Sequence, residues 1–209
     1  VEEALSSNFE VLEVYRTEEI GEEAMSRMSA LSSPSPALAV CRQKVWNEAE
    51  ALRAGCLYLA LDGIKDPGNL GTILRIADWF GVEKVFLSED CVEIYNPKVV
   101  QSTMGAIFRV PFEYCDLAEV LKCGCEVLGT FLDGENIYSA SIDSGKPIVI
   151  VIGSESFGIR EKVAPLCKGR LTIPSYKADR NAQVDTPECE SLNAAIATAI
   201  AVAEVRRRL

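Results

Sequence analysis

Residues 56–81, CLYLALDGIKDPGNLGTILRIADWFG, decide the fold, because an apolar run leads into a turn and then into a helical pattern. The run CLYLAL, residues 56–61, shows no alternation of apolar and polar side chains, which is typical of a strand covered on both faces. The segment after the turn is predicted to be a helix that begins at a capping Asn69 and ends at Gly81. Its apolar stripe consists of Leu70, Ile73, Leu74 and Ala77.

Four further apolar runs resemble the first one, namely KVFLS (84–88), EVLGTF (126–131), PIVIVI (147–152) and RLTI (170–173). Helical patterns separate most of these runs, and the chain ends in a long Ala-rich helical segment after residue 190. Strands that alternate with helices predict an α/β domain with a mainly parallel sheet.

The composition points to an ordinary globular protein without a membrane segment. Of the 209 residues, 48% are hydrophobic, which is enough for a buried core. No apolar run approaches the roughly 20 residues that a membrane span needs, and the N-terminal residues lack the order of a signal peptide. We therefore expect a cytoplasmic location and no membrane partner.

Cysteine and histidine usage limits the possible chemistry. Several of the eight cysteines lie inside apolar runs, so we expect reduced thiols that pack in the core. Cys123 and Cys125 are too closely spaced for a zinc pair, and no histidine is present, so no metal is expected. The lack of histidine also excludes Ser-His-Asp and Cys-His nucleophile schemes within one chain.

The charge is unevenly distributed along the chain. The net charge is −10, but residues 160–209 hold nine Lys and Arg against six Asp and Glu, so a charge of +3 there leaves −13 elsewhere. This asymmetry keeps nucleic-acid binding open, and basic residues such as Arg160 and Lys162 are candidates for it.

Two domains are expected. Residues 1–44 are rich in Glu and Ser and end in a loop-then-strand pattern, LSSPSPALAV (31–40). They are too few for an independent domain and are interpreted as a partial N-terminal module, followed by a main domain at 45–209. The polar stretch 174–190 is expected to form a mobile loop before the last helix.

Three polar turns are candidates for a site, because ligands of open α/β sheets bind beyond the carboxyl ends of the strands. The first turn leads to Gly71, Arg75 and Asp78, which are expected on one polar helix face, although a solvated face with an ion pair would also explain them. The second is VIGSESFGI (151–159), and the third is ESLNAAIATAI (190–200). Each turn also has a purely structural explanation. The second could be a tight turn with a capping Glu155, and in the third Ser191 and Asn193 could simply cap a helix.

Together these segments resemble the SpoU (TrmH-like) RNA 2′-O-ribose methyltransferases of the SPOUT superfamily. DPGNLGTILRIA, VIGSESFGI and TIP…ESLNAAIATAI are similar to the three motifs of the family in order and spacing, and NPKVVQSTMGAIFRVPF (96–112) is similar to its intermediate stretch. The resemblance covers about residues 30–209. It implies a deep C-terminal trefoil knot, a homodimer, S-adenosylmethionine as cofactor, and an N-terminal part that binds RNA.

The resemblance also implies roles for individual residues. The cofactor contacts carried over are Thr130, Leu132, Gly153, Ile173 and Leu192. Arg75 matches the motif-one arginine, and because a guanidinium stays protonated, it is expected to stabilise an alkoxide or to bind the adjacent phosphate. The resemblance gives catalytic roles to four further residues. Asn69 would position the ribose or its phosphate, and Glu155 would hold Arg75 or Asn69 in place. Ser191 and Asn193 would line the acceptor side. Ribosomal RNA is favoured over transfer RNA as the substrate.

Alternatives remain open at this point. A dehydrogenase is disfavoured because the first turn has no Gly-x-Gly-x-x-Gly pattern, and a serine hydrolase is disfavoured because nothing could activate Ser154 or Ser156. A non-catalytic RNA-binding protein of the same fold is the main competitor. The sequence departs from the family pattern in the sixteen residues that separate Pro174 from Ser191.

Overall fold

The computed structural model describes residues 1–29, 31–46, 51–176 and 191–209. Its main domain is built on a six-stranded parallel sheet with the strand order β5-β4-β3-β7-β6-β8. The strands are β3 (Leu57–Asp62), β4 (Val85–Leu87), β5 (Phe112–Tyr114), β6 (Glu126–Asn136), β7 (Ile148–Gly153) and β8 (Gly169–Thr172). The predicted α/β class with a mainly parallel sheet is confirmed.

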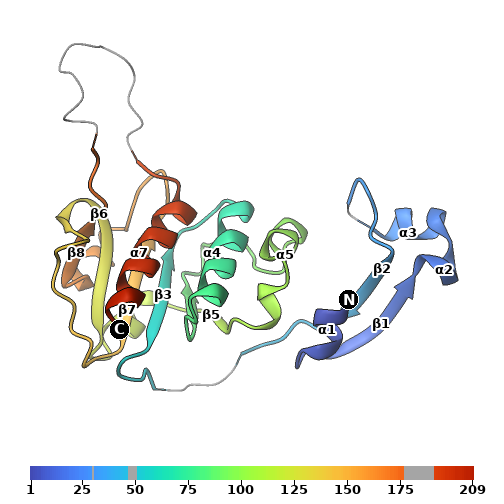
Figure 1. Ribbon diagram of the computed structural model, residues 1–209, viewed down its shortest axis with the longest axis horizontal. Coiled ribbons are helices and arrows are strands. Elements are labelled where there is room, and N and C mark those ends of the chain that lie inside the picture. Colours follow the sequence, from blue (N-terminus) through green and yellow to red (C-terminus); the bar gives the residue numbers. More distant parts are fainter. Residues whose placement is uncertain (30, 47–50, 177–190) are drawn as a thin grey trace, which may run out of the picture.

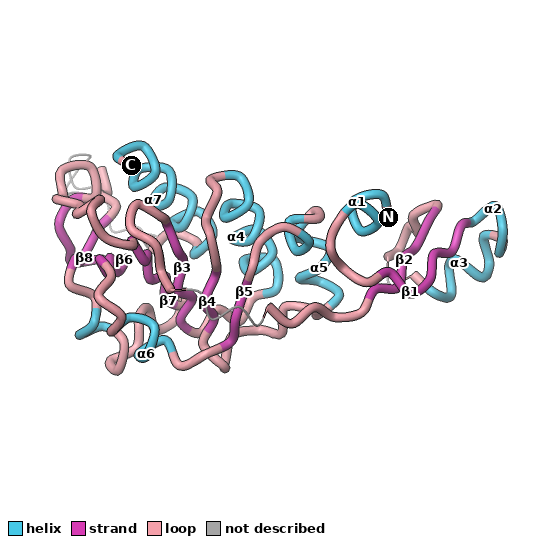
Figure 2. Tube along the Cα trace, turned by 90° about the horizontal axis from the view of Figure 1, so that it is seen from below, coloured by secondary structure: helices cyan, strands magenta, loops and turns pink. Residues whose placement is uncertain are grey.

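Helices cover both faces of the sheet. Helices α4 (Pro67–Trp79) and α7 (Ala194–Arg208) lie side by side on one face, and α5 (Pro97–Thr103) lies next to α4 (Figure 1). The short helix α6 (Leu117–Leu121) lies on the opposite face (Figure 2). Two short 3₁₀ helices, η1 (Ala106–Phe108) and η2 (Ala164–Leu166), complete the domain.

The five predicted strands are confirmed, and the central strands β3 and β7 are buried on both faces. Every residue of β3 is buried, and so are the first five of β7. Strand β6 runs to Asn136, further than its apolar run, because Glu135 and Asn136 pair with β8 after a shift of register. Strand β5 is an addition, since its three residues, Phe-Glu-Tyr, are too few to give a sequence signal.

Helix α4 confirms the apolar stripe but corrects two details. Its N-cap is Asp66, whose side chain accepts a hydrogen bond from the Asn69 backbone N–H at 2.7 Å, so Asn69 is not the cap but lies in the first turn. Gly71 was expected on the polar face, yet it is buried against α5. A Cβ on Gly71 would lie 2.7 Å from Ser102 Cβ, so the absence of a side chain lets the two helices meet.

Helix α7 is fixed at both ends. Asn193 caps it by accepting hydrogen bonds from the Ala195 and Ile196 N–H groups, so Ser191 lies before the helix and is not its cap. At the other end, Arg206 Nε donates to the Phe80 carbonyl at 2.8 Å, directly after α4. Arg208 donates to the Ile137 and Ala140 carbonyls that follow β6. The last helix therefore ties α4 to the exit of β6.

Two apolar cores lie on either side of the sheet. One core joins the sheet to α4 and α7 through residues such as Ile73 and Val202, and the other joins it to α6 through Leu117 and Leu121. Cys167 belongs to the second core, and burial raises the pKa of its thiol to about 12. The seven cysteines in the described part of the chain are all unpaired.

Residues before the main domain form a two-stranded antiparallel sheet of β1 (Val11–Arg16) and β2 (Ala37–Cys41). The helices α1 (Glu2–Ser6), α2 (Thr17–Ile20) and α3 (Glu22–Met28) accompany it. Strand β2 matches the predicted strand at the end of LSSPSPALAV. The segment contacts the main domain through Phe9, whose ring lies 5.0 Å from that of Phe108, and through Arg109, which pairs with Glu3 at 3.1 Å.

Within the ranges given above, no helix has the length and apolarity to cross a membrane. In the same ranges no three His, Cys, Asp or Glu side chains are grouped so that they could bind a metal ion. The loop predicted for 174–190 lies largely outside the described residues, which resume at Ser191.

Candidate active site

The three polar turns meet at the carboxyl edge of the sheet. Strands β3 and β7 are neighbours that pair Asp62 with Gly153 at this edge, so the turns that follow them start side by side. The side-chain amide of Asn193 donates to Asn69 Oδ1 at 2.8 Å, and Asn69 Nδ2 in turn donates to Glu155 Oε1. One hydrogen-bonded chain therefore links all three segments.

The turn that carries Glu155 is held by its own backbone. The Ser154 and Gly158 backbones exchange two hydrogen bonds of 3.2 and 2.8 Å, and the Phe157 N–H donates to Ser154 Oγ at 3.2 Å. Gly158 has a φ of +64°, which favours glycine, and a Cβ on Gly153 would overlap the Gly158 backbone. Gly153 and Gly158 therefore shape the turn that presents Glu155.

An ion pair between Asp62 and Arg160 anchors this turn to the end of β3. Asp62, only 1% exposed at the end of β3, accepts hydrogen bonds from the Arg160 backbone N–H at 2.8 Å and from Arg160 Nε at 2.6 Å. Arg160 also pairs with Asp90 at 3.1 Å, and Ser88 Oγ donates to Asp90 at 2.7 Å. The hydrogen bond to Asp62 raises the pKa of Arg160, and that from Ser88 lowers the pKa of Asp90.

This arrangement changes the interpretation of several charges. Arg160 was a candidate for RNA binding, but its guanidinium is engaged with two carboxylates, and Lys162 lies 4.0 Å from Asp116. Asp62 was not among the site residues expected from the sequence. A charged residue at the end of an otherwise apolar strand was the available signal.

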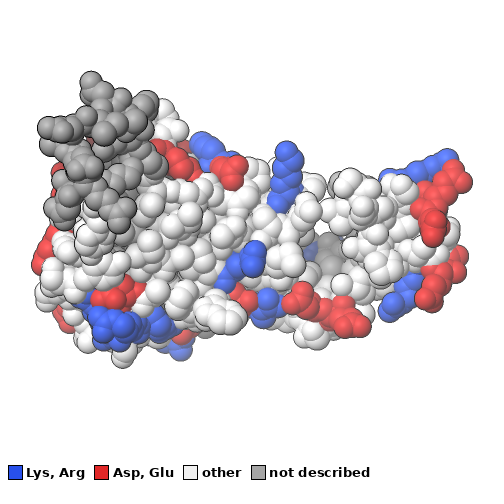
Figure 3. Space-filling view, turned by 45° about the horizontal axis from the view of Figure 1, so that its top comes forward, with Lys and Arg blue, Asp and Glu red and all other residues white. Residues whose placement is uncertain are grey.

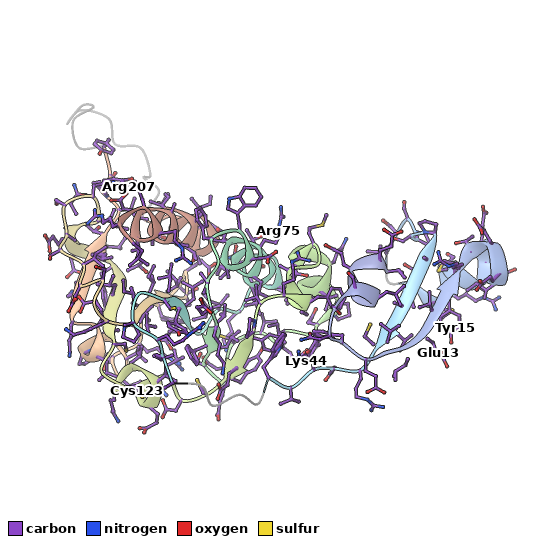
Figure 4. All side chains as sticks on the ribbon, turned by 60° about the horizontal axis from the view of Figure 1, so that its bottom comes forward. Glu13, Tyr15, Lys44, Arg75, Cys123 and Arg207 are labelled. Carbon is purple, nitrogen blue, oxygen red and sulfur yellow. The ribbon has the colours of Figure 1, made fainter. Side chains whose placement is uncertain are left out.

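Arg75 lies on the solvent-facing side of α4 (Figure 4). It lines an open cleft of about 710 Å³ between α4, α5 and the start of α7, which Asn69 and Asn193 also line. Asp78, the expected ion-pair partner, binds Arg109 at 2.8 Å instead. Among the described residues Arg75 has no ion pair or side-chain hydrogen bond, so its charge is directed at the cleft and solvent.

Four of the five expected cofactor contacts lie on or directly after three adjacent strands, and Leu192 precedes α7. Gly153 ends β7, Thr130 lies on β6 with its hydroxyl donating to the Val151 carbonyl at 3.2 Å, and Ile173 follows β8. The side chains of Leu132 and Leu192 are 75% and 46% exposed. Exposed apolar side chains beside polar strand ends suit S-adenosylmethionine, whose adenine needs apolar walls and whose methionyl group needs polar partners.

A family model described as the SpoU rRNA methylase family matches residues 56–203. The chain belongs to the SpoU family. A solved RNA methyltransferase of the TrmH family from Porphyromonas gingivalis is 40% identical, with a TM-score of 0.73 over 88% of this chain and 71% of that one. An AdoMet-bound rRNA methyltransferase from Sinorhizobium meliloti is 25% identical, with a TM-score of 0.86 over 100% of this chain and 84% of that one.

Curated relatives of this SpoU chain are named as RNA methyltransferases. The 23S rRNA (guanosine(2553)-2′-O)-methyltransferase RlmP of Bacillus subtilis is 29% identical over 90% of this chain and 71% of its own length. An uncharacterised tRNA/rRNA methyltransferase from Synechocystis is 33% identical over 73% of this chain. The chain spans 53% of the length of that relative. The 23S rRNA (guanosine-2′-O-)-methyltransferase RlmB of Nitrosomonas europaea is 32% identical over 76% of this chain, which spans 59% of its length.

Proposed function

We propose that the protein is an S-adenosylmethionine-dependent RNA methyltransferase that acts on a ribose 2′-hydroxyl, with ribosomal RNA as substrate in preference to transfer RNA. The observation that carries the proposal is the Asn193–Asn69–Glu155 chain beside the unpaired Arg75 at the carboxyl edge of the sheet. Membership of the SpoU family and the named activities of RlmP and RlmB support it.

Each residue of the hydrogen-bonded chain has a defined task in this proposal. Asn69 is oriented from both ends, since its amide nitrogen faces Glu155 and its oxygen faces Asn193, and it positions the target ribose. Glu155 fixes the orientation of Asn69, while Asn193 and Ser191 line the acceptor side.

Arg75 supplies the positive charge. Bound S-adenosylmethionine supplies an electrophilic methyl group on its sulfonium. The ribose 2′-oxygen gains negative charge as its proton passes to water in the open cleft, and a guanidinium that stays protonated can stabilise that charge or the neighbouring phosphate. Arg75 suits this role because no carboxylate among the described residues neutralises it.

The cofactor site belongs to the same proposal. Thr130, Leu132, Gly153, Ile173 and Leu192 would hold S-adenosylmethionine between the middle of β6 and the carboxyl ends of β7 and β8. The C-terminal part of the chain would be threaded into the trefoil knot of SPOUT enzymes. The overall similarity to the AdoMet-bound Sinorhizobium meliloti structure supports this placement.

A homodimer is also part of the proposal. Trp79 at the end of α4 is 85% exposed, and Ile196 in the first turn of α7 is 54% exposed. The surface over α4 and α7 carries few charged groups (Figure 3). Exposed apolar surface of this kind marks an interface, so these two helices would pack against a second copy. Because Ile196 also lines the cleft of Arg75, the interface would border that cleft.

The remaining parts of the proposal concern organisation. Residues 1–44 would be a partial RNA-binding module that precedes the methyltransferase domain at 45–209, and the small β1–β2 sheet supports that division. A cytoplasmic location is also part of the proposal, because the relatives named above are bacterial and bacteria assemble ribosomes in the cytoplasm.

The test uses the full chain with radiolabelled S-adenosylmethionine and ribosomal RNA. Methyl transfer should yield a ribose-methylated nucleotide that resists alkaline cleavage of the following phosphodiester. Arg75→Ala should lose about a hundredfold or more of this activity while keeping its affinity for S-adenosylmethionine in isothermal titration. Wild-type turnover by that variant would contradict the role of Arg75, and RNA binding without any affinity for the cofactor would favour a non-catalytic RNA-binding protein.

A further inference from the structure

Most cations in the described part of the chain already have partners. Carboxylates pair with lysines and arginines throughout the main domain, as in Lys65–Asp90, Lys84–Glu113, Lys122–Glu119, Lys146–Asp143, Arg53–Glu83, Arg109–Asp78 and Arg170–Asp133. This pattern is expected for a chain with 31 acidic and 21 basic residues. A lysine or arginine without a carboxylate partner in such a protein is therefore a candidate for binding an anionic ligand.

Two cations without a partner line the same cleft. Within the described ranges, the side chains of Arg75 and Lys98 form no ion pair and no hydrogen bond, and both line the cleft between α4, α5 and α7. Arg16, Lys44, Lys168 and Arg206 are also without an ion pair in these ranges, but none of them lines the cleft. The cleft thus holds two available positive charges.

The position of Lys98 is set by tight packing. Asn96 caps α5 by accepting a hydrogen bond from the Lys98 N–H at 3.0 Å. Ser102 Oγ lies 3.1 Å from the Pro67 carbonyl of α4, and Gly71 leaves space for Ser102. Helix α5 therefore cannot shift freely, and its backbone places Lys98 on the wall of the cleft that Arg75 also lines.

The charge balance of the cleft favours an anion. Among the described residues that line the cleft, Asp66 is the one carboxylate, against the two cations Arg75 and Lys98, and it accepts a hydrogen bond from the Asn69 N–H at 2.7 Å. Like charges that share a cleft repel one another, so two free cations are most stable when an anionic ligand lies between them. A lysine ammonium on a flexible stem binds phosphate as a point charge.

We propose that Lys98 binds a backbone phosphate of the RNA substrate in this cleft, next to the nucleotide whose ribose Arg75 faces. The inference rests on the proposed function and extends it to a residue outside the three motifs. Gln101 lines the same wall one helical turn later and can donate to the same backbone. The anionic group of S-adenosylmethionine is its carboxylate, and none of the proposed cofactor contacts lines this cleft, so Lys98 is assigned to the RNA and not to the cofactor.

The test compares Lys98→Gln with the matched control Lys168→Gln, which removes an exposed lysine outside the cleft. Loss of one charged phosphate contact should raise the KM for ribosomal RNA about tenfold, with kcat within about twofold. The slope of log binding constant against log salt should fall by about 1, while Lys98→Arg keeps most of the affinity. Lys168→Gln and the affinity for S-adenosylmethionine should not change.

The possible failures are distinct. A Lys98→Gln protein with wild-type KM and salt slope, beside an inactive Arg75→Ala protein, overturns the inference and leaves the proposed function intact. A wild-type protein without methyl transfer contradicts the proposed function, and anisotropy of labelled RNA then still decides whether Lys98 contributes to the salt slope. A weaker dimer with unchanged RNA binding would show that Lys98 faces a second copy, which also overturns the inference.

Discussion

The side chain of Asp62 accepts two hydrogen bonds from Arg160, one from its backbone N–H at 2.8 Å and one from its Nε at 2.6 Å, although the two residues are 98 positions apart. The contact joins the end of β3 to the segment directly after the Glu155 turn. Because the Asp62 side chain is fully buried, Arg160 is the group that satisfies its charge. The turn that presents Glu155 thus depends on a carboxylate at the end of a neighbouring strand.

Replacing Asp62 by Asn should therefore affect both stability and catalysis. Breaking a buried pair from one side costs about 3 kcal/mol in free energy of unfolding, measured by chemical denaturation. The kcat for methyl transfer should fall as the Glu155 turn loosens. Asp90→Asn is the control, because Asp90 is 41% exposed in its side chain and its loss leaves Arg160 bound to Asp62. Its cost should stay below about 1 kcal/mol, and equal effects of the two variants would contradict the anchoring role of Asp62.

The Asn69–Glu155 hydrogen bond can be tested by exchanging donor and acceptor. Asn69→Asp removes the amide donor and places two carboxylates side by side, so methyl transfer should fall steeply. Glu155→Gln in the same chain restores a donor facing an acceptor, and the carboxylate introduced by Asn69→Asp can still accept from Asn193. The double variant should recover activity by a coupling of about 1–3 kcal/mol in activation free energy. Additive losses in kcat/KM would show that the two side chains act independently.

The strands of the sheet could be predicted because burial on both faces leaves a local record, a near-continuous apolar run such as PIVIVI at β7. Strand β5 left no such record. The cap of α4 was misplaced because DPGN offers two capping residues, and Pro67 in the first turn should have favoured Asp66.

The site could be predicted only in part, for a related reason. Asn69, Glu155 and Asn193 stand in recognisable segments, and the structure joins them. Asp62 and Lys98 were missed because their importance comes from contacts and exposure in three dimensions. A buried ion pair across 98 positions, or a lysine that lacks a partner, leaves no periodic signal.

Gly71 gives a test of how α4 and α5 approach each other. Alanine normally stabilises a helix interior relative to glycine by about 1 kcal/mol. Here its Cβ would lie 2.7 Å from Ser102 Cβ and 2.9 Å from the Ser102 carbonyl carbon, so Gly71→Ala should instead cost about 1–3 kcal/mol in unfolding free energy. Ser102→Gly in the same chain should relieve part of that cost. A Gly71→Ala protein with a higher melting temperature would contradict this packing.

The proposed dimer predicts which exposed apolar residues matter. Trp79→Glu and Ile196→Glu each introduce a charge on the helices expected to meet a second copy, so either should convert the dimer to monomer in light scattering. Val45→Glu is the control, because Val45 is 72% exposed but lies outside these helices. Equal dissociation by all three variants, or by none, would contradict an interface on α4 and α7.

Glu204 predicts how stability depends on acid. Hydrogen bonds from Arg207 and Arg208 lower its pKa from 4.5 to about 2 in the folded chain. A depressed carboxylate pKa adds stability that is complete above the unfolded value of about 4.5 and is lost as the pH falls toward about 2. Because Arg208 also binds the carbonyls after β6, this loss should loosen the anchor of α7.

Glu204→Gln isolates this contribution from those of other acidic groups. The difference in unfolding free energy between the wild type and Glu204→Gln should be constant above the unfolded pKa and should shrink steadily below it, because glutamine does not titrate. Denaturation curves taken at neutral pH and at intervals down to the folded pKa measure that difference. If the difference stays constant over the whole range, Glu204 titrates alike in the folded and unfolded chain, and the two arginines do not stabilise its charge.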